Sequence, residues 1–299
     1  MKVLAITGDR SFAPGYPRFD LQRAAVNELS VVYWWRGSLW PKIPLGKFDV
    51  VTAQDPLCRG LFGWLTARRI GAKFNVQVHT DLSARNFFWR VLARAILRNA
   101  DSIRVVSEKI KNQVLSMGTR APVHVLPIYV DVSRFRNIKR QPHTQKTILW
   151  FGRFEPEKDP LLAIKILEQI RRTIAAKLIM LGAGSLEKSL KTNAARLNLA
   201  AQVEFPGWRE PLPYLAQADM VLCTSRHESY GASVIEALAA GVPVVAPDVG
   251  IAKSAGAVVA PREKLADAVI EVLRSEKIGE LKVPLLDKEA WIQKWRDTL

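Results

Sequence analysis

Residues 225–245 read SRHESYGASVIEALAAGVPVV, and of the whole chain this stretch comes closest to indicating a chemistry. Small and apolar residues follow Gly231 at helical spacing, so we expect a helix that ends at Gly241. The next residues, 242–246, favour a buried strand. A short helix that leads directly into such a strand is typical of a parallel α/β sheet.

Two glutamates, Glu228 and Glu236, bracket seven residues around the start of this helix. Gly231, Ala232 and Ser233 carry little side chain there, which leaves the first backbone amides open to a phosphate. A carboxylate repels a phosphate, so the glutamates are better suited to accept hydrogen bonds from a sugar on one side and a ribose on the other. The pattern predicts a nucleotide-sugar site. The simpler alternative is that Glu228 interacts with the helix dipole and Glu236 is solvated.

The stretch resembles the glutamate-seven-glutamate signature of the retaining glycosyltransferases of family 4, and residues 237–245 are similar to that family's helix-turn-strand. The resemblance implies the GT-B fold, an α/β architecture of two facing Rossmann-like, doubly wound domains with a C-terminal helix that crosses back. It also implies that Glu228 holds the sugar hydroxyls and Glu236 the ribose. Tyr230 and residues 231–233 would contact the donor, and Glu228 would belong to the catalytic set.

A second motif, residues 151–160, places Arg153 and Lys158 five positions apart after a strand-like run. A guanidinium binds phosphate oxygens as a fork and an ammonium adds a point charge, so the pair can neutralise a leaving diphosphate without a metal. The run resembles the family's phosphate-binding pattern, which implies donor-binding and catalytic roles for both residues. The chain has no Asp-x-Asp pair and no cluster with metal-ligand spacing, so we expect no metal and no other cofactor.

Glycine-containing turns follow two further strand-like runs in this half of the chain. Gly184 permits a close backbone approach to a ribose or base, although such a turn is often only a tight connection. In residues 206–209 the resembled family contacts the nucleobase largely through backbone near Arg209. The choice between uridine and guanosine is therefore left open.

His79 and Gly15 are the candidates in the first half of the chain. A lone histidine is more often structural than catalytic. Residues 76–81, however, resemble a family strand that ends in a histidine facing the donor sugar, which implies a catalytic role for His79. Gly15 lies in a loop, residues 8–17, that resembles the family's first loop beside the acceptor but lacks the paired glycines often found there.

Strand-like segments alternate with helical patterns in two series, which predicts two parallel sheets. The segments are 3–6, 50–52, 74–78, 103–106 and 123–126, then 147–152, 177–181, 203–205, 220–223 and 242–246. A turn-rich stretch, 136–144, separates them and predicts an acceptor domain over residues 1–140 and a donor domain over 141–280. Residues 281–299 contain an amphipathic helix that, in the resembled family, packs back on the first domain.

The net charge of +16 is concentrated in the first half of the chain. Residues 1–140 carry 23 Lys and Arg against 9 Asp and Glu, whereas residues 141–299 carry 21 against 19. Such a field attracts a lipid surface, a nucleic acid or an acidic glycan, although solubility alone is an alternative. The phosphate-type motifs lie in the nearly neutral half and no recognition motif is evident, so we expect no nucleic-acid partner.

Arg90, Arg94 and Arg98 recur every four residues beside aromatic and aliphatic side chains in the segment 87–98. The pattern predicts an amphipathic helix whose apolar face packs on the first sheet. The alternative is that the helix docks at an anionic membrane interface. A second candidate contact patch consists of Trp34, Trp35, Arg36, Trp40 and Lys42.

The chain has no apolar run long enough to span a bilayer, and its start is charged too soon for a signal peptide. Cys58 and Cys223 are solitary, as is usual in a reducing compartment. We therefore expect a cytoplasmic protein, peripheral at the inner face of the cell membrane.

Together these observations predict a retaining, metal-independent hexosyltransferase. It would move a sugar from a UDP- or GDP-linked donor to a glycan or lipid-linked acceptor at an anionic membrane surface. The alternatives are a nucleotide-sugar epimerase of the same fold and a basic nucleic-acid-binding or membrane-peripheral protein without catalytic activity.

Overall fold

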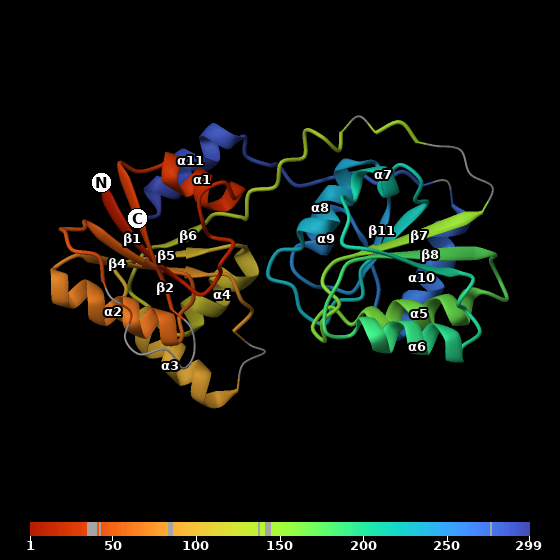
Figure 1. The fold of residues 1–299 in the computed structure, drawn as a ribbon, viewed down its shortest axis with the longest axis horizontal. Coiled ribbons are helices and arrows are strands. Elements are labelled where there is room, and N and C mark those ends of the chain that lie inside the picture. The colour runs from red at the N-terminus through yellow and green to blue at the C-terminus, as the bar shows by residue number, and fades with distance from the viewer. Residues whose placement is uncertain (35–40, 42, 83–85, 137, 141–144, 276) are drawn as a thin grey trace. The chain divides into compact units, whose positions relative to one another are not determined.

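The computed structural model describes residues 1–34, 41, 43–82, 86–136, 138–140, 145–275 and 277–299. The chain forms two compact units (Figure 1). The first contains Met1–Tyr129 and Leu286–Leu299, and the second contains Val130–Leu285. The first unit thus ends at Tyr129, before the expected boundary at residue 140. It also includes the last residues of the chain, Leu286–Leu299. Four residues of the second contact patch, Trp35, Arg36, Trp40 and Lys42, lie outside the described residues.

The first unit is built on a parallel sheet of six strands in the order β2-β1-β3-β4-β5-β6. Its strands are β1 (Lys2–Thr7), β2 (Glu28–Tyr33), β3 (Val50–Ala53), β4 (Lys73–Val78), β5 (Ser102–Val105) and β6 (Val123–Val125). Its helices are α1 (Pro17–Ala24), α2 (Cys58–Ile70), α3 (Phe87–Arg98), α4 (Glu108–Ser116) and α11 (Lys288–Asp297). The strand β2 was not predicted from the sequence, although residues 31–33 form an apolar run; the strand lies at the edge of the sheet and is only partly buried.

Helices cover both faces of this sheet, as expected for a doubly wound domain (Figure 1). On one face α1 and α11 lie side by side, and Trp291 and Trp295 of α11 are buried in a core with Phe19 and Leu21 of α1. On the other face lie α2, α3 and α4. The C-terminal helix therefore completes the core of the first unit.

Only part of the apolar surface of α3 packs inside the unit. Ala93, Ile96 and Leu97 are buried, as predicted for a helix that packs on the sheet. The start of the helix differs from this prediction, because Phe87 is 82% and Phe88 67% exposed. The two side chains lie in the first turn of α3, whereas the buried residues begin at Ala93.

The second unit contains a parallel sheet of six strands in the order β12-β11-β10-β7-β8-β9. Its strands are β7 (Lys146–Phe151), β8 (Ala176–Leu181), β9 (Val203–Gly207), β10 (Met220–Leu222), β11 (Val244–Ala246) and β12 (Val258–Val259). Its helices are α5 (Pro160–Ile170), α6 (Glu187–Arg196), α7 (Leu212–Leu215), α8 (Ala232–Ala239), α9 (Ala252–Ala255), η1 (Arg262–Lys264) and α10 (Leu265–Arg274). The short strand β12 was not predicted.

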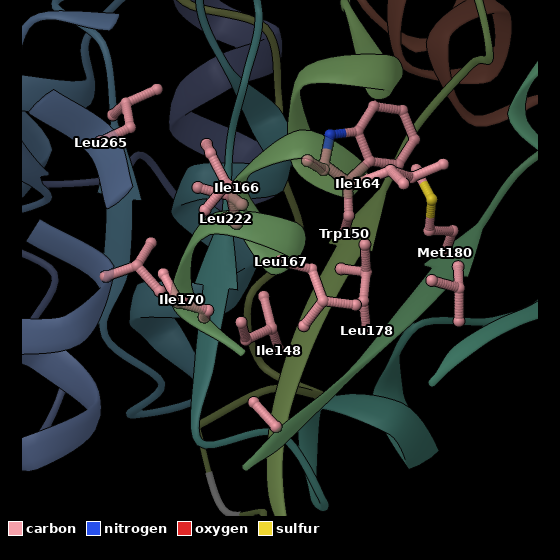
Figure 2. Packing of buried hydrophobic residues seen from close by; sticks show 14 of the residues in the cluster. Ile148, Trp150, Ile164, Ile166, Leu167, Ile170, Leu178, Met180, Leu222 and Leu265 are labelled. Atoms are coloured by element: carbon pink, nitrogen blue, oxygen red, sulfur yellow. The ribbon is translucent and has the colours of Figure 1, made fainter. Parts of the chain in front are cut away.

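Two apolar cores lie on opposite faces of the second sheet. On one face α5, α6 and α10 pack on the sheet, and Figure 2 shows Ile148 and Trp150 of β7 beside Ile164 and Leu167 of α5. On the other face α7, α8 and α9 bury a second set of side chains, including Leu238 of α8. The prediction of two α/β, doubly wound units is confirmed.

The strand order decides where loops of the second unit meet. Strand β7 lies between β8 and β10, so the chain moves to one side of β7 first and to the other side later. In an open parallel sheet, ligands bind outside the carboxyl ends of the strands at such a switch point. The loops that follow β7 and β10 therefore form the expected position of a binding site.

Candidate functional site

Lys158 from the loop after β7 and Glu228 from the loop after β10 form an ion pair. Their Nζ and Oε1 atoms are 2.5 Å apart, and the two side chains are only 22% and 11% exposed. The hydroxyl of Ser225 donates to the same Oε1 atom over 2.8 Å. A carboxylate that accepts from both groups is held in one orientation before any ligand arrives.

A small hollow of about 20 Å³ lies beside this pair. It is lined by Trp150, Phe151, Lys158, Val221, Leu222, Cys223, Thr224, Ser225, Glu228 and Ser233. These residues come from β7, β10, the loops that follow them and the first turn of α8. The hollow therefore joins the predicted phosphate-binding loop to the predicted helix N-terminus.

The loop after β7 is anchored to the loop after β10 by residues that the sequence analysis did not single out. Thr224 Oγ1 donates to the carbonyl oxygens of Lys158 and Asp159 over 3.0 and 2.9 Å. Asp159 has a positive φ of 44° and forms ion pairs with Arg226 and Arg262. Arg262 also donates to the Thr224 carbonyl over 2.6 Å. No local pattern reveals these partners, because they lie far apart in the sequence.

The N-terminus of α8 lies at the same place. Gly231 precedes the helix with φ of 100°, and no side chain of the described residues caps the first turn. The amides of Ala232 and Ser233 have no partner within the helix, since the first amides of any helix lack one. Tyr230 is buried, which raises the pKa of its phenol to about 12, and its carbonyl accepts from the Ile251 amide over 2.9 Å.

Glu236 lies one turn into α8 and is half-buried. Among the described residues its carboxyl group has no hydrogen-bond or ion-pair partner, and burial followed by the charge of Glu210 raises its pKa to about 7. Glu210 follows Arg209 in the loop after β9. Arg209 is exposed and donates through Nε to the Pro206 carbonyl over 3.3 Å. A half-buried carboxyl without a partner has acceptor capacity to spare for a ligand hydroxyl.

The backbone packing around Gly184 by itself requires a glycine at this position. It has φ of 157°, and a Cβ atom there would lie 2.6 Å from the carbonyl oxygen of Phe154. The glycine lets the loop after β8 approach the loop after β7, where the Phe154 amide donates to the Ala183 carbonyl over 2.9 Å. Its predicted contact with a donor stays a prediction.

The structure brings some of the predicted donor-site residues together and separates others from the hollow. Lys158, Glu228 and Ser233 line it, whereas Arg153 and Glu236 do not. Arg153 is exposed and its Nη2 atom lies 2.7 Å from Oε1 of Glu157. Contacts of Arg153 and Glu236 with a diphosphate and a ribose remain predictions.

The two candidates of the first unit lie at the carboxyl ends of its strands. His79 follows β4, and its Nε2 atom lies 3.3 Å from Oε1 of Gln77. Burial, then the charges of Arg104 and Arg18, hold the pKa of His79 well below its ordinary value. Gly15 lies in an exposed loop, and its amide donates to Asp20 Oδ1 over 3.2 Å. The predicted contacts of His79 with a donor sugar and of Gly15 with an acceptor stay predictions.

Neither a metal cluster nor a membrane span is found in the described part of the chain. No three His, Cys, Asp or Glu side chains there are grouped so that they could hold a metal ion. No helix there is both long enough and apolar enough to cross a bilayer.

The family model described as Glycosyl transferases group 1 matches residues 131–283, just over half of the chain. The chain belongs to this glycosyltransferase family. A second model, described as Glycosyltransferase Family 4, matches residues 3–134 of the same glycosyltransferase. The predicted resemblance to the family 4 glycosyltransferases is therefore confirmed. One of the two models matches mainly the first unit and the other matches the second.

Relatives with curated descriptions are similar over part of their length. The lipopolysaccharide core biosynthesis glycosyltransferase LpsE of Rhizobium meliloti (strain 1021) is 28% identical over 153 residues, which cover 50% of this glycosyltransferase and 44% of LpsE. The GDP-mannose-dependent alpha-(1-6)-phosphatidylinositol monomannoside mannosyltransferase of Mycobacterium tuberculosis (strain ATCC 25618 / H37Rv) is 30% identical over 220 residues, covering 62% and 57%. The chain thus spans about half the length of these relatives.

Among solved structures, HepE of Anabaena in complex with UDP-glucose superposes with a TM-score of 0.74. The two are 18% identical, and the match covers 99% of this glycosyltransferase and 94% of HepE. At this identity the likeness establishes the fold. The expected GT-B fold, with two α/β units that are each built on a parallel sheet, is confirmed.

Proposed function

We propose that this glycosyltransferase transfers a hexosyl group, with retention at the anomeric carbon, from a UDP- or GDP-linked sugar to a glycan or lipid-linked acceptor. The observation that carries the proposal is the Lys158–Glu228 pair at the carboxyl ends of β7 and β10, beside the first turn of α8. A cation, a fixed carboxylate and free helix amides are the groups that a sugar diphosphate requires.

In the proposed reaction the bond from the anomeric carbon to the diphosphate oxygen breaks, and a bond to the acceptor hydroxyl oxygen forms on the same face of the sugar. The hydroxyl proton passes to a phosphate oxygen, and the nucleoside diphosphate leaves. Lys158, Arg153 and the amides of Ala232 and Ser233 stabilise its charge. Glu228 accepts hydrogen bonds from the sugar hydroxyls and Glu236 from the ribose.

The relatives support the choice of donor and acceptor. One is named for its use of GDP-mannose on a phosphatidylinositol mannoside, and another for lipopolysaccharide core biosynthesis. HepE was solved with UDP-glucose. We therefore propose a nucleotide-sugar donor and leave its nucleoside open between uridine and guanosine.

We propose further that the leaving diphosphate is neutralised by protein cations without a divalent ion. The ammonium of Lys158 and the guanidinium of Arg153 occupy one loop, and each provides donors to phosphate oxygens. Transfer measured with and without EDTA tests this proposal. A rate that falls to background on chelation and returns with added magnesium would overturn it.

The proposal also includes contact with an anionic membrane through α3. Phe87 and Phe88 are exposed at the start of this helix, and Arg90, Arg94 and Arg98 are exposed along it. Apolar rings beside guanidinium groups suit the interface of an anionic bilayer.

The central experiment is a thermal-shift panel of nucleoside diphosphates and their sugars on the intact chain. Binding to the folded state raises the melting temperature by mass action, so UDP or GDP, but not uridine or guanosine alone, is expected to shift it. Proton NMR of the transferred sugar then reports the anomeric configuration. An inverted product overturns retention, and an epimerised donor formed without acceptor would indicate an isomerase of the same fold.

A further inference from the structure

The first unit contains a cavity of about 290 Å³ of its own. It opens at the carboxyl ends of β1, β4 and β6 and is lined by Asp9, Ser11, Tyr16, Pro17, Arg18, Leu21, His79, Arg104, Ile128, Tyr129 and Trp291. All of these residues belong to the first unit, including Trp291 of α11. The volume lies near the lower end of the range for small-molecule sites.

Arg104 is the unusual member of this lining. It lies inside β5 and is only 2% exposed, although charged side chains are rarely buried without a partner of opposite charge. Its Nε donates to the Leu126 carbonyl over 3.1 Å, Nη1 to Gln77 Oε1 over 2.9 Å and Nη2 to the Pro127 carbonyl over 3.2 Å. Every one of these acceptors is neutral. No carboxylate of the described residues forms an ion pair with it.

A guanidinium has five N–H donors, so these three bonds leave donors available at the cavity. Burial and the charge of Arg18 lower the pKa of Arg104 to about 9, and the group therefore remains a cation at neutral pH. The Trp291 ring lies 5.2 Å from its Cζ atom and offers a partial compensation through its π face. The charge still lacks an anion.

A second guanidinium, that of Arg18 at the start of α1, lines the same cavity. Its Nη1 atom lies 3.4 Å from Oδ2 of Asp9, and its Cζ atom lies 5.0 Å from the ring centre of Phe12. Burial and then the positive charges of Arg104 and Arg18 lower the pKa of His79, which lines the same cavity. Among the described residues that line the cavity Asp9 is the one carboxylate, so two arginines there face one acid.

The rest of the lining is largely apolar and aromatic. Tyr16, Tyr129 and Trp291 surround the arginines with ring surfaces. Small-molecule sites typically combine such surfaces with a few polar groups that fix orientation. A bare inorganic ion would leave most of this cavity empty, whereas an anion attached to a ring would fill it.

We propose that this cavity binds an anionic group, phosphate or carboxylate, carried on a hydroxylated ring of the acceptor. The guanidinium of Arg104 and that of Arg18 bind the oxyanion, and the aromatic side chains contact the ring. The inference rests on the proposed function, because it names the class of acceptor that the first unit selects. The donor's own diphosphate is the other possible source of an oxyanion, and the experiment separates the two.

The test is isothermal titration calorimetry on the intact chain saturated with UDP. Glucose 6-phosphate, glucuronate and inorganic phosphate are titrated as anions, and glucose serves as the neutral ring. We expect at least one anionic sugar to bind about tenfold or more tightly than glucose, since a charged hydrogen bond contributes that much. Equal affinity for glucose and both anionic sugars would overturn the proposal. So would loss of anion binding on addition of UDP, because the anion would then belong to the donor site.

Arg18→Gln is the decisive variant, because Arg18 is partly exposed; its Nη2 also donates to Gln54 Oε1, so the melting temperature of the variant is measured beside its affinity. It should weaken binding of the anionic sugar about tenfold and leave glucose unchanged. Arg104→Lys keeps the positive charge but loses the two-pronged guanidinium, and it should also weaken binding of the anionic sugar. Arg69→Gln, an exposed arginine outside the cavity, is the matched control and should bind like wild type. Wild-type affinity in Arg18→Gln would contradict the assignment even if Arg104→Lys failed to fold.

Titration of UDP alone separates this inference from the proposed function. If UDP does not bind but the anionic sugar does and depends on Arg18, the donor assignment fails and the anion site stands. If UDP binds and the anionic sugar does not, the acceptor inference fails and the donor site stands. Lys158→Gln should weaken UDP without changing the affinity for the anionic sugar.

Discussion

Lys158 Nζ lies 2.5 Å from Glu228 Oε1, although the two residues are 70 positions apart in the sequence. The pair joins the loops after β7 and β10, the two strands at which the order of the second sheet changes direction. The same carboxylate accepts from Ser225. This connection fixes one predicted phosphate-binding residue against one predicted sugar-binding residue.

Replacing Lys158 by Gln should destabilise the protein by about 1–3 kcal/mol, because the nearly buried Glu228 carboxylate is left without its cation. Glu228→Gln should cost a similar amount. The double variant should cost less than the sum of the two. Urea unfolding of all four proteins gives the coupling energy, and strictly additive effects would show that the pair does not interact in solution.

Glu236→Gln should alter how stability depends on pH. The Glu236 carboxyl has a pKa of about 7 in the folded protein, above the value of 4.5 for an unperturbed glutamate. Its contribution to stability is therefore fully present below pH 4.5 and is lost as pH rises through about 7. As pH rises from 4.5 to about 7, the melting temperature of Glu236→Gln should therefore increase relative to that of wild type.

The matched control for that experiment is Glu263→Gln, at an exposed glutamate of the same unit. Its melting temperature should follow that of wild type at every pH. A constant offset between Glu236→Gln and wild type from pH 4.5 to 8 would mean that Glu236 does not titrate in this range.

Gly184→Ala should weaken UDP binding and destabilise the second unit. The added methyl group would meet the Phe154 carbonyl oxygen at 2.6 Å, and the displaced loop carries Lys158. Gly71→Ala is the control, because that glycine also has positive φ but has open space around the Cβ position. Gly184→Ala should cost at least about 1 kcal/mol more than Gly71→Ala. Calorimetry with UDP and urea unfolding measure the two effects, and equal losses would remove the clash as their cause.

Trp295→Ala should destabilise the first unit by about 3–5 kcal/mol, since this side chain is fully buried between α11 and the sheet. Trp295→Phe should cost clearly less, because the indole Nε1 atom is buried without a hydrogen-bond partner in the described structure. Lys294→Ala, at the exposed neighbouring position, should remain within about 0.5 kcal/mol of wild type. Guanidinium unfolding followed by circular dichroism gives all three values.

The double variant Phe87→Ser/Phe88→Ser should reduce binding to vesicles of anionic phosphatidylglycerol. Both rings are exposed at the start of α3, so their removal should not unfold the unit. Leu115→Ser, which removes an exposed apolar side chain of α4, serves as the control. Vesicle sedimentation should show several-fold weaker binding for the double variant only. Undiminished binding would remove α3 as the contact site.

Local patterns predicted most elements of both units. The buried strands appear as short apolar runs, and α8 and α11 were recognised from their apolar faces and end signals. The strands β2 and β12 were not predicted; both lie at an edge of their sheet and are only partly buried, and their apolar runs, residues 31–33 and 258–259, are short. Phe87 and Phe88 were grouped with the core of α3 because periodicity assigns a face to a helix but does not say how far the neighbouring layer extends.

The sequence alone determined where α8 begins and ends, and it placed Glu228 and Glu236 on either side of that start, because these features depend on residues close along the chain. The strand order placed β7 beside β10 and so joined Lys158 to Glu228. Tertiary packing also surrounded Arg104 with neutral acceptors and brought Trp291 against it from the far end of the chain. Such contacts depend on which segments the sheet makes neighbours, and that is settled by burial of the whole core rather than by any local pattern.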